Sequence, residues 1–284
     1  MKYYVLYNGK ANNGRGYAGA TTIQSRLQGE KIEYVDAYKM KYDRYFAEKK
    51  NEDCRIVLCG GDGTLNYFVN HTTDETREID FDFFPTGTGN DFCKDIELKP
   101  GEIVKNVNRY LKNLPTVTVN GKSYKFINGV GYGIDGYCCE IGDVERSKST
   151  KPVNYTAIAI KGILFHFKPR TATIIIDNKP EMVVENSWLV PTMKGRCYGG
   201  GMYPAPLQDR NATDGKLSVM TYRTKSAIKA LAVFPKIFKG EHIKSNIVNI
   251  YTGYNITVRF DKPCSMQIDG ETILNVSEYV VNAK

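Results

Sequence analysis

The chain has 284 residues, 42% of them hydrophobic and 25% charged, which are ordinary values for a globular protein with room for two domains. Its net charge of +8 suits an anionic partner such as a nucleotide, an acidic membrane surface or nucleic acid, without choosing among them. Seven cysteines without a CxxC pair argue against a disulfide framework or a zinc site, and no apolar run approaches the roughly 18 residues that span a bilayer.

The N-terminal segment predicts alternating strands and helices. A strand is expected at Tyr3–Tyr7, a polar glycine-rich loop at 8–16, a helix to about Leu27 and a second strand at Lys31–Val35. This alternation is typical of an open sheet with parallel strands.

The first loop also allows a second interpretation, as the dinucleotide-binding fingerprint of a dehydrogenase. The run Gly14-Arg15-Gly16-Tyr17-Ala18-Gly19 matches GxGxxG, and Asp36 lies 17 residues beyond its last glycine. In that fingerprint the first glycine sits in the tight turn at the end of the strand, whereas a long polar loop separates Tyr7 from Gly14 here. A dehydrogenase is therefore the less favoured interpretation.

The strongest motif follows the next predicted strand, Cys54–Leu58. It is Cys59-Gly60-Gly61-Asp62-Gly63-Thr64-Leu65-Asn66. Apolar residues then recur at helical spacing, so we expect a helix that begins near Thr64, with Thr64 as its N-cap. Three glycines let backbone N–H groups approach a phosphate, and the helix dipole attracts it. Asp62 would suit a magnesium ion or a ribose hydroxyl beside that phosphate, and a plain Asp-Gly turn is the alternative.

A second glycine-rich turn follows a strand predicted at Phe81–Phe84. It is Pro85-Thr86-Gly87-Thr88-Gly89-Asn90-Asp91-Phe92, and a short helix should follow. In open α/β sheets, ligands bind at the carboxyl ends of the strands. The loops 8–16, 60–66 and 86–91 would therefore converge on one crevice, which is a stronger signal than any one loop.

The second half of the chain changes in character at Pro115, after a helix predicted at about 102–113. Short β-rich runs dominate, with the alternation and turn spacing of an antiparallel sheet or sandwich. We therefore predict an α/β domain over residues 1–114 and a β-rich domain over residues 115–284. The tail, 276–284, is too short for a domain of its own and is expected to pair back onto an existing sheet, with the first domain as one choice.

Two acidic turns of the second half are candidate sites. Asp209, Asn211 and Asp214 lie within six residues and could hold a hard cation, although an Asp-Gly hairpin explains the spacing equally well. The turn Met266–Glu271 ends in Asp-Gly-Glu after a β-run, a setting that can aim a carboxylate into a cleft. A surface glutamate in a hairpin is the alternative there.

These motifs resemble the diacylglycerol kinase catalytic domain family, which includes soluble bacterial lipid kinases, sphingosine kinases and ceramide kinases. The resemblance rests on Gly60-Gly61-Asp62-Gly63-Thr64 followed by Pro85–Phe92, and further on the glycine-rich turn Asn128–Gly136 and the Asp-Gly-Glu turn. It implies an open α/β sheet domain of NAD-kinase and phosphofructokinase type, followed by an antiparallel β-sandwich-like domain. One departure is the first loop, where the family usually has proline after asparagine and this chain has glycine.

The resemblance also implies the residues of the site. ATP would be held by residues of the three loops: Asn8, Gly9, Lys10, Asn12, Gly60, Gly61, Asp62, Gly63, Thr64, Leu65, Asn66 and Thr88. A structural magnesium ion would take the Asp214 side chain and the carbonyls of Asn211 and Lys216. Glu271 would be the general base that removes the proton of a lipid hydroxyl, with Asp91 as a second catalytic residue.

Two basic amphipathic segments, 225–244 and Tyr155–Phe167, allow two interpretations. Apolar positions recur at helical spacing among lysines, and Pro235 should divide the first segment. Such helices can lie on an anionic membrane, but a core-packed helix with a solvated lysine face is the more common case.

We therefore predict an ATP- and magnesium-dependent lipid kinase that phosphorylates diacylglycerol or a related lipid, with ATP and Mg²⁺ in a cleft between the domains. It would act in the cytoplasm, on a lipid substrate at the inner face of the membrane, without a transmembrane segment. Nucleic acid is not expected as a partner, because the charges are dispersed, and a homodimer stays open. A NAD-kinase-like phosphotransferase and a non-catalytic nucleotide-binding module are the alternatives, and Asp135 is the alternative base.

Overall fold

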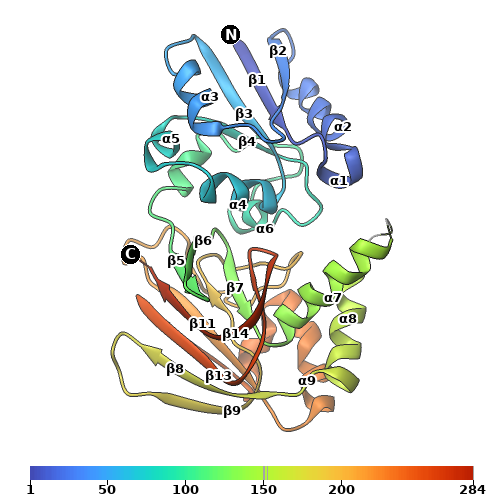
Figure 1. Ribbon diagram of the computed structural model, residues 1–284, viewed down its shortest axis with the longest axis vertical. Helices are drawn as coiled ribbons and strands as arrows, with labels where there is room; N and C mark the ends of the chain where they lie inside the picture. Colours follow the sequence, from blue (N-terminus) through green and yellow to red (C-terminus); the bar gives the residue numbers. More distant parts are fainter. Residues whose placement is uncertain (150, 152, 284) are drawn as a thin grey trace. The chain divides into compact units, whose positions relative to one another are not determined.

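The computed structural model describes residues 1–149, 151 and 153–283, which fold as two compact units. The first covers Met1–Leu114 and the second begins at Pro115 (Figure 1). Each unit has a sheet and a hydrophobic core of its own. The predicted fold class, an α/β part followed by an antiparallel β-rich part, is confirmed.

The first unit is built on a four-stranded parallel sheet in the order β2-β1-β3-β4. Its strands are β1 (Lys2–Tyr7), β2 (Lys31–Asp36), β3 (Cys54–Gly60) and β4 (Asp82–Pro85). Side chains alternate across a strand, and in β1 both Tyr4 and Leu6 on one face and Tyr3 and Val5 on the other are buried. A strand that is apolar on both faces suits a parallel sheet, which is covered by helices on both sides.

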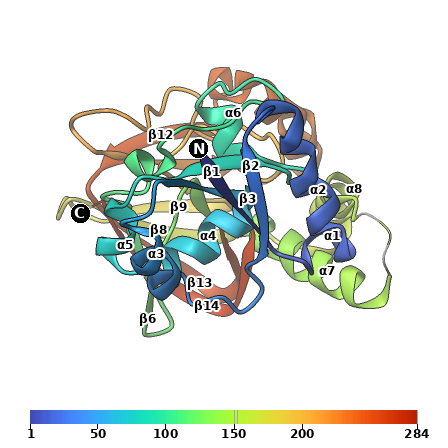
Figure 2. The ribbon, with the colours of Figure 1, turned by 90° about the horizontal axis from the view of Figure 1, so that it is seen from above.

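Helices cover the two faces of this sheet (Figure 2). One face carries α1 (Ala11–Gly14), α2 (Gly16–Thr21) and the 3₁₀ helix η1 (Thr22–Arg26). There Ala20 and Ile23 pack with Val5 of the central strand. The opposite face carries α3 (Tyr42–Lys49), α4 (Asp62–Asn70) and α5 (Asp74–Glu78). There the rings of Phe46 and Phe68 meet with their centroids 5.5 Å apart.

Two predicted helices of this unit differ in the structure. The helix expected to run to Leu27 is divided among α1, α2 and η1. The helix expected at 102–113 is reduced to η2 (Val107–Tyr110), because Val104 pairs with Phe83 in an extended bridge and Asn106 adopts φ +50°. Extended and left-handed backbone cannot continue an α-helix. The short helix predicted after the second glycine turn is present as α6 (Asp91–Asp95).

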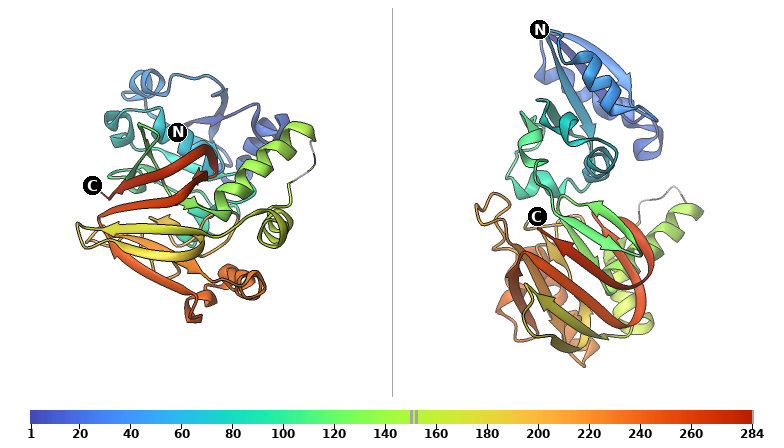
Figure 3. Two further views of the ribbon diagram at one scale, coloured as in Figure 1. Left: turned by 60° about the horizontal axis from the view of Figure 1, so that its bottom comes forward. Right: turned by 60° about the vertical axis from the view of Figure 1, so that its left-hand side comes forward.

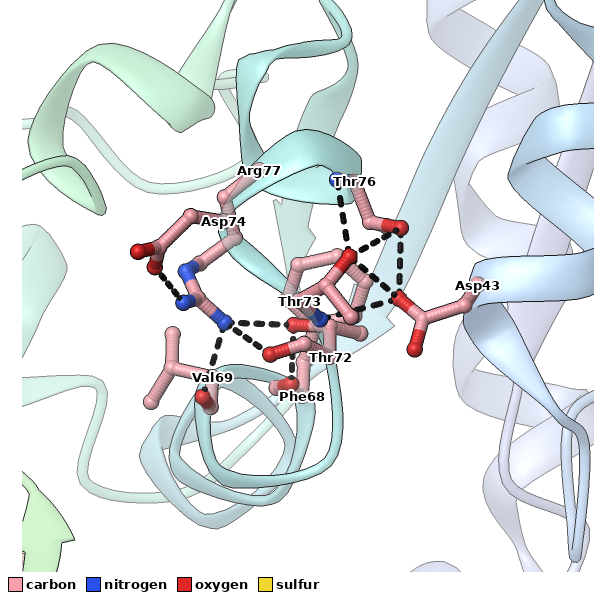
Figure 4. A network of polar contacts seen from close by, with 8 residues as sticks. All are labelled: Asp43, Phe68, Val69, Thr72, Thr73, Asp74, Thr76 and Arg77. Carbon is pink, nitrogen blue, oxygen red and sulfur yellow. Dashed lines mark hydrogen bonds and ion pairs between the residues drawn. The ribbon is translucent and has the colours of Figure 1, made fainter.

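A buried arginine fixes the end of α4 (Figure 4). Arg77 donates to the carbonyl of Val69 at 3.0 Å and to Thr72 Oγ1 at 2.9 Å. These contacts satisfy a carbonyl that a helix C-terminus leaves without a partner, and they place a cation at the negative end of the helix dipole. Beside them, the amide of Thr73, the N-cap of α5, donates to Asp43 at 3.0 Å, which ties α3 to the same turn.

The second unit is a ten-stranded antiparallel sheet within its described residues. Its strands are β5 (Thr116–Val119), β6 (Lys122–Lys125), β7 (Gly129–Tyr132), β8 (Arg170–Ile176), β9 (Met182–Leu189), β10 (Thr192–Met193), β11 (Leu217–Arg223), β12 (Val248–Gly253), β13 (Asn255–Ile268) and β14 (Glu271–Asn282). The order β13-β7-β10-β11-β9-β8 returns to β13, because β8 also pairs with β13. The sheet therefore closes on itself around a core that includes Val130, Val219 and Val258.

The tail belongs to this second sheet. Strand β14 pairs with β13 on one side and with β5 on the other. Its side chains Val276, Tyr279 and Val281 are fully buried in the same core. The alternative that the tail pairs with the first domain is wrong, because both edges of β14 pair with strands of the second unit and its apolar side chains are buried in that unit's core.

Helices pack on the closed sheet of the second unit. They are α7 (Ile134–Lys148), α8 (Tyr155–Lys161), the π-helical turn η3 (Gly162–His166), α9 (Ala227–Val233) and the 3₁₀ helices η4 (Phe234–Lys239) and η5 (Glu241–Lys244). Figure 3 shows α7 beside β13 and β14. The inner faces of these helices form a second core with Trp188 and Tyr222 of the strands. Among the described residues, no helix is both long enough and apolar enough to cross a bilayer.

Candidate active site

The two glycine-rich turns of the first unit touch each other through their backbones. A Cβ built on Gly87 would lie only 2.6 Å from the Cα of Gly61, and one on Gly61 would lie 3.0 Å from the Cα of Gly87. The amide of Thr86 also donates to the carbonyl of Gly60 at 2.8 Å. Side chains at these glycines would separate the loops, so the glycine pair is what allows them to form one surface.

Asp62 joins the same two turns from its position at the first residue of α4. Its Oδ2 accepts from the amide of Asp91 and its Oδ1 from the amide of Phe92, both at 2.9 Å. The carboxylate thus serves as the N-terminal cap of α6, where the preceding residue, Asn90, makes no side-chain cap. The sequence suggested a magnesium ion or a ribose hydroxyl beside this carboxylate, or a plain Asp-Gly turn, and in the structure each of its oxygens accepts a hydrogen bond from a backbone amide.

The rest of the central motif divides into an exposed and a buried part. Gly63 is exposed, and a Cβ built on it would meet no atom within 4 Å. Leu65 is completely buried and Asn66 nearly so, so their side chains belong to the interior of the unit. The predicted N-cap role of Thr64 is wrong: α4 begins two residues earlier, at Asp62, with Gly61 as N-cap, because the turn tightens directly after β3.

The second turn offers one exposed and one buried residue. Thr88 is exposed at the tip of the turn. Asp91 is buried, and Lys94 Nζ lies 3.7 Å from its Oδ1. The two residues predicted for nucleotide binding and catalysis in this turn therefore stand in different surroundings, with Thr88 open to solvent and Asp91 held beside a cation.

The first loop is closed by Asp36. The amide of Gly9 donates to Asp36 Oδ1 at 3.0 Å, and a Cβ on Gly9 would lie 2.5 Å from Asp36 Oδ2. Asn8 Oδ1 accepts from the amide of Lys10 at 2.9 Å, which turns the chain after β1. The exposed Lys10 ammonium lies 4.2 Å from the centre of the Tyr38 ring. This geometry gives Asp36 a structural task.

Two further predictions concern the same loop. The glycines of the GxGxxG match lie in α1 and α2 and not at the end of β1, so the geometry of a dinucleotide fingerprint is not met. Asn12 lies in α1, and its side chain is outside the described part of the structure.

The predicted metal loop lies before β11 in the second unit. Asp214 Oδ1 accepts from the amide of Lys216 at 3.2 Å, and the Lys216 ammonium lies 3.4 Å from Oδ2. The hydrogen bond from the Lys216 amide is the main cause that lowers the pKa of Asp214. The Lys216 carbonyl accepts from Gln208 at 3.0 Å, and Asn211 is exposed. No group of three or more His, Cys, Asp or Glu side chains gathers anywhere in the described ranges, so a cation here would rely on one carboxylate and carbonyl groups.

The Asp-Gly-Glu turn separates its two carboxylates. Asp269 accepts from three successive backbone amides, those of Ile127, Asn128 and Gly129, at 2.6, 2.9 and 3.0 Å. Glu271 is the exposed first residue of β14. The turn therefore uses its aspartate to hold the chain before β7 and presents its glutamate to solvent.

Sequence reasoning missed a buried arginine that holds the same segment. Arg210 donates from Nη1 to the Ile127 carbonyl at 2.7 Å and from Nη2 to Asn128 Oδ1 at 2.8 Å. Arg210 stands in the sequence among the polar residues Asp209, Asn211 and Asp214, which are typical of a solvated loop. Its partners lie 83 and 82 residues away in the sequence, so no local pattern reveals that Arg210 is buried.

Asp135 is a buried carboxyl group of the second unit with a raised pKa. It lies buried at the start of α7, where Gln267 Nε2 donates to its Oδ2 at 2.9 Å. A Cβ on Gly131 would lie 1.6 Å from that oxygen, so only glycine fits opposite it. Burial raises the pKa of Asp135 to about 6, although hydrogen bonding with Gln267 and Tyr198 acts in the other direction.

Comparison with known proteins gives consistent results for both units. Residues 2–120 match the diacylglycerol kinase catalytic domain, and residues 128–281 match the YegS C-terminal NAD kinase beta sandwich-like domain. The chain is 29% identical to a candidate lipid kinase of Staphylococcus haemolyticus, over 88% of this chain and 78% of that protein. It is 24% identical to a diacylglycerol kinase of Mycobacterium tuberculosis, over 87% of this chain and 82% of that protein. A solved structure of a candidate diacylglycerol kinase from Bacillus anthracis has the same fold, with a TM-score of 0.63 at 18% identity over 99% of this chain and 94% of that one.

Proposed function

The chain belongs to the diacylglycerol kinase catalytic domain family, and we propose that it is an ATP- and magnesium-dependent lipid kinase. It would transfer the γ-phosphoryl group of ATP to a hydroxyl of diacylglycerol or a related lipid. Bound ATP supplies the phosphoryl group. The residues of the chain hold and orient it and take the proton that the hydroxyl loses.

The observation that carries this proposal is the contact between Gly61 and Gly87 at the N-terminus of α4. Beside that contact, the position of a Cβ on Gly63 is open. The first amides of a helix have no acceptor within the helix and lie at the positive end of its dipole, so they suit phosphate oxygens. Lys10, exposed in the loop after β1, adds a positive charge that can pair with phosphate.

The proton of the lipid hydroxyl needs an acceptor, because a hydroxyl holds it firmly at neutral pH. We assign this task to Glu271, which is exposed and forms no ion pair with any described residue. Asp91 is the second catalytic candidate, since it starts α6 beside the glycine contact. Asp135 is the alternative base, and its burial disfavours it against Glu271.

The donor set for magnesium has the right chemistry. Mg²⁺ prefers carboxylate and carbonyl oxygens with water in the remaining positions. The Asp214 carboxylate and the carbonyls of Asn211 and Lys216 supply such oxygens, and the Lys216 carbonyl keeps a lone pair beside its bond from Gln208. The Lys216 ammonium would move away from Asp214 when the ion binds. The ion would then hold the loop before β11.

Incubation with γ-labelled ATP, magnesium chloride and a total lipid extract tests the proposal, with the labelled products identified by chromatography. We expect one labelled lipid class, which also names the acceptor. A nucleotide-binding module would label nothing, and a NAD-kinase-like enzyme would label NAD in a parallel incubation. Separation of lysed source cells into membrane and cytoplasmic fractions tests the further proposal that the protein acts in the cytoplasm on lipid of the inner membrane face. We expect the protein in the cytoplasmic fraction, with a part of it on the membranes.

A further inference from the structure

The helical layer of the second unit exposes large apolar side chains. Ile228 is 78% exposed, Phe165 72%, Leu164 43% and Ile160 40%, and we call these four residues the apolar tip. They come from neighbouring elements, because α8 continues directly into η3 and α9 packs against η3. Figure 1 shows α8 and α9 on the same side of this unit.

The apolar tip is additional to the face that the helices already bury. Ile158 and Ile163 from the α8 segment, and Ala230 and Val233 from α9, lie in the core with Trp188. The tip residues of α8 and η3 lie on the opposite face at helical spacing, Ile160 being four residues before Leu164. A surface helix needs one apolar stripe to pack on its domain, so a second exposed stripe indicates contact with another apolar phase.

Only positive charge surrounds the apolar tip in the sequence. Residues 149–176 and 215–240 contain no aspartate and no glutamate. Four lysines next to the tip residues are exposed and form no ion pair with any described residue, and we call them the lysine collar: Lys161, Lys168, Lys225 and Lys229. Exposed apolar side chains in segments that carry lysines and no acidic residue are complementary to an anionic surface with an apolar interior.

We propose that the apolar tip and the lysine collar dock the second unit on the surface of an anionic lipid bilayer. The apolar side chains enter the boundary between headgroups and acyl chains, and the ammonium groups meet lipid phosphates. Protein interfaces are depleted in lysine, whereas an anionic bilayer attracts both parts of this surface. The inference rests on the proposed function in one respect: a lipid substrate would lie in such a bilayer.

Sedimentation with vesicles tests the proposal. The parent protein should bind vesicles of phosphatidylcholine and phosphatidylglycerol, and bind pure phosphatidylcholine less. Phe165→Ser/Ile228→Ser should lower the partition coefficient about 10-fold or more, because two large apolar groups no longer leave water. Lys161→Gln/Lys225→Gln should lower binding to the anionic vesicles alone, most clearly at low salt.

A matched control comes from exposed apolar residues on strands of the same unit. Val183→Ser/Leu274→Ser removes two such side chains from β9 and β14 and should bind vesicles as the parent does. Equal binding by the parent and the Phe165→Ser/Ile228→Ser variant would overturn the proposal. So would light scattering that shows a dimer for the parent and a monomer for that variant, because the tip would then be a protein interface.

A kinase assay separates this inference from the proposed function. With lipid presented in detergent micelles, the Phe165→Ser/Ile228→Ser variant should keep the parental rate, and with vesicles it should be slower. An equal rate in both presentations would contradict docking by the tip. A parent that binds vesicles through the tip but labels no lipid would overturn the proposed function and leave the docking surface in place.

Discussion

The carboxylate of Asp62 accepts a hydrogen bond from the backbone amide of Asp91 at 2.9 Å, across 29 residues of sequence. Its second oxygen holds the next amide, that of Phe92. One side chain thus fixes the start of α6 to the start of α4 and keeps the two glycine turns in contact. The task of Asp62 in this geometry is to position the turns.

Asp62→Asn should therefore lower turnover by orders of magnitude while the chain still folds. An amide can accept with one oxygen only, so one of the two backbone N–H groups loses its partner, which costs about 1–3 kcal/mol. We expect a lower melting temperature, weaker ATP binding by calorimetry and an unchanged dependence of the rate on magnesium concentration. A strong shift in that dependence at constant melting temperature would mean that Asp62 holds the metal.

Gly63→Ala should separate ligand binding from folding. The added Cβ meets no protein atom, and alanine is about 1 kcal/mol better than glycine inside a helix, so the melting temperature should stay or rise. ATP affinity should fall, because the methyl group stands where phosphate would approach the amides. Gly60→Ala is the contrasting variant, since its Cβ would lie 2.1 Å from Thr64 Oγ1 and should destabilise the fold. Parental ATP binding by Gly63→Ala would exclude a cradle at this turn.

Glu271→Gln should lower the rate of phosphoryl transfer by roughly 10²-fold or more with ATP affinity nearly unchanged, since glutamine keeps the size but cannot take a proton. The residue is exposed, so the melting temperature should not change. Asp269→Asn is the matched variant in the same turn. It disturbs a carboxylate that holds three amides and should lower the melting temperature. A parental rate for Glu271→Gln would move the base to Asp91 or Asp135.

Asp135→Asn should remove a pH dependence of stability. The pKa of Asp135 in the folded protein is raised to about 6, so the folded state binds the proton more tightly than the unfolded chain does. The resulting stabilisation is complete at low pH and is lost as the pH rises through about 6. Near pH 7.5 the asparagine variant should be more stable by about 2–3 kcal/mol, and near pH 4 it should equal the parent. Denaturant titrations at both pH values measure this, and parallel curves for the two proteins would contradict it.

Arg77→Ala should lower the free energy of unfolding by about 2–4 kcal/mol, because the Val69 carbonyl and the end of α4 lose their buried donor. Arg44→Ala is a suitable control from the same unit. Among the described residues Arg44 forms one ion pair, an exposed one with Glu48 four residues on, which is worth about 0.5 kcal/mol or less. Urea unfolding of the three proteins measures both effects, and equal midpoints for the two variants would refute the role of Arg77.

The sequence was informative where local chemistry decides the structure. Glycine turns after β-branched runs gave the ends of β3 and β4, since strand, turn and helix start all depend on neighbouring residues. The antiparallel sheet of the second half was predicted from the alternation of apolar and polar residues, which has a period of two along each strand. The helix expected at 102–113 failed because a distant strand decides that segment: Val104 pairs with Phe83 of β4.

The candidate site was less predictable, because side-chain partners lie far away in the sequence. Nothing near Asp62 indicates that its oxygens meet the amides at 91 and 92. Likewise, the sequence does not distinguish the roles of the two carboxylates in Asp-Gly-Glu. In the folded chain Asp269 accepts hydrogen bonds from the amides at 127–129, whereas Glu271 is exposed. The amphipathic spacing also did not predict that Ile228 and Phe165 are exposed. Other apolar residues of the same helices are buried in the core, and the pattern does not show which apolar positions are left outside it.

The pairing of β14 with β5 sets the order in which the chain can fold. In the first unit the paired residues lie at most 52 positions apart, as Lys2 and Cys54 do, whereas Val117 of β5 pairs with Val281 of β14. Strand β5 can pair early with its neighbour β6, but its other edge needs β14, which comes at the end of the second unit. Closing so long a loop before its contacts form is slow. The second unit should therefore complete its folding last. Until then Val117 and Val119 of β5 are exposed and can associate with apolar surfaces of other chains.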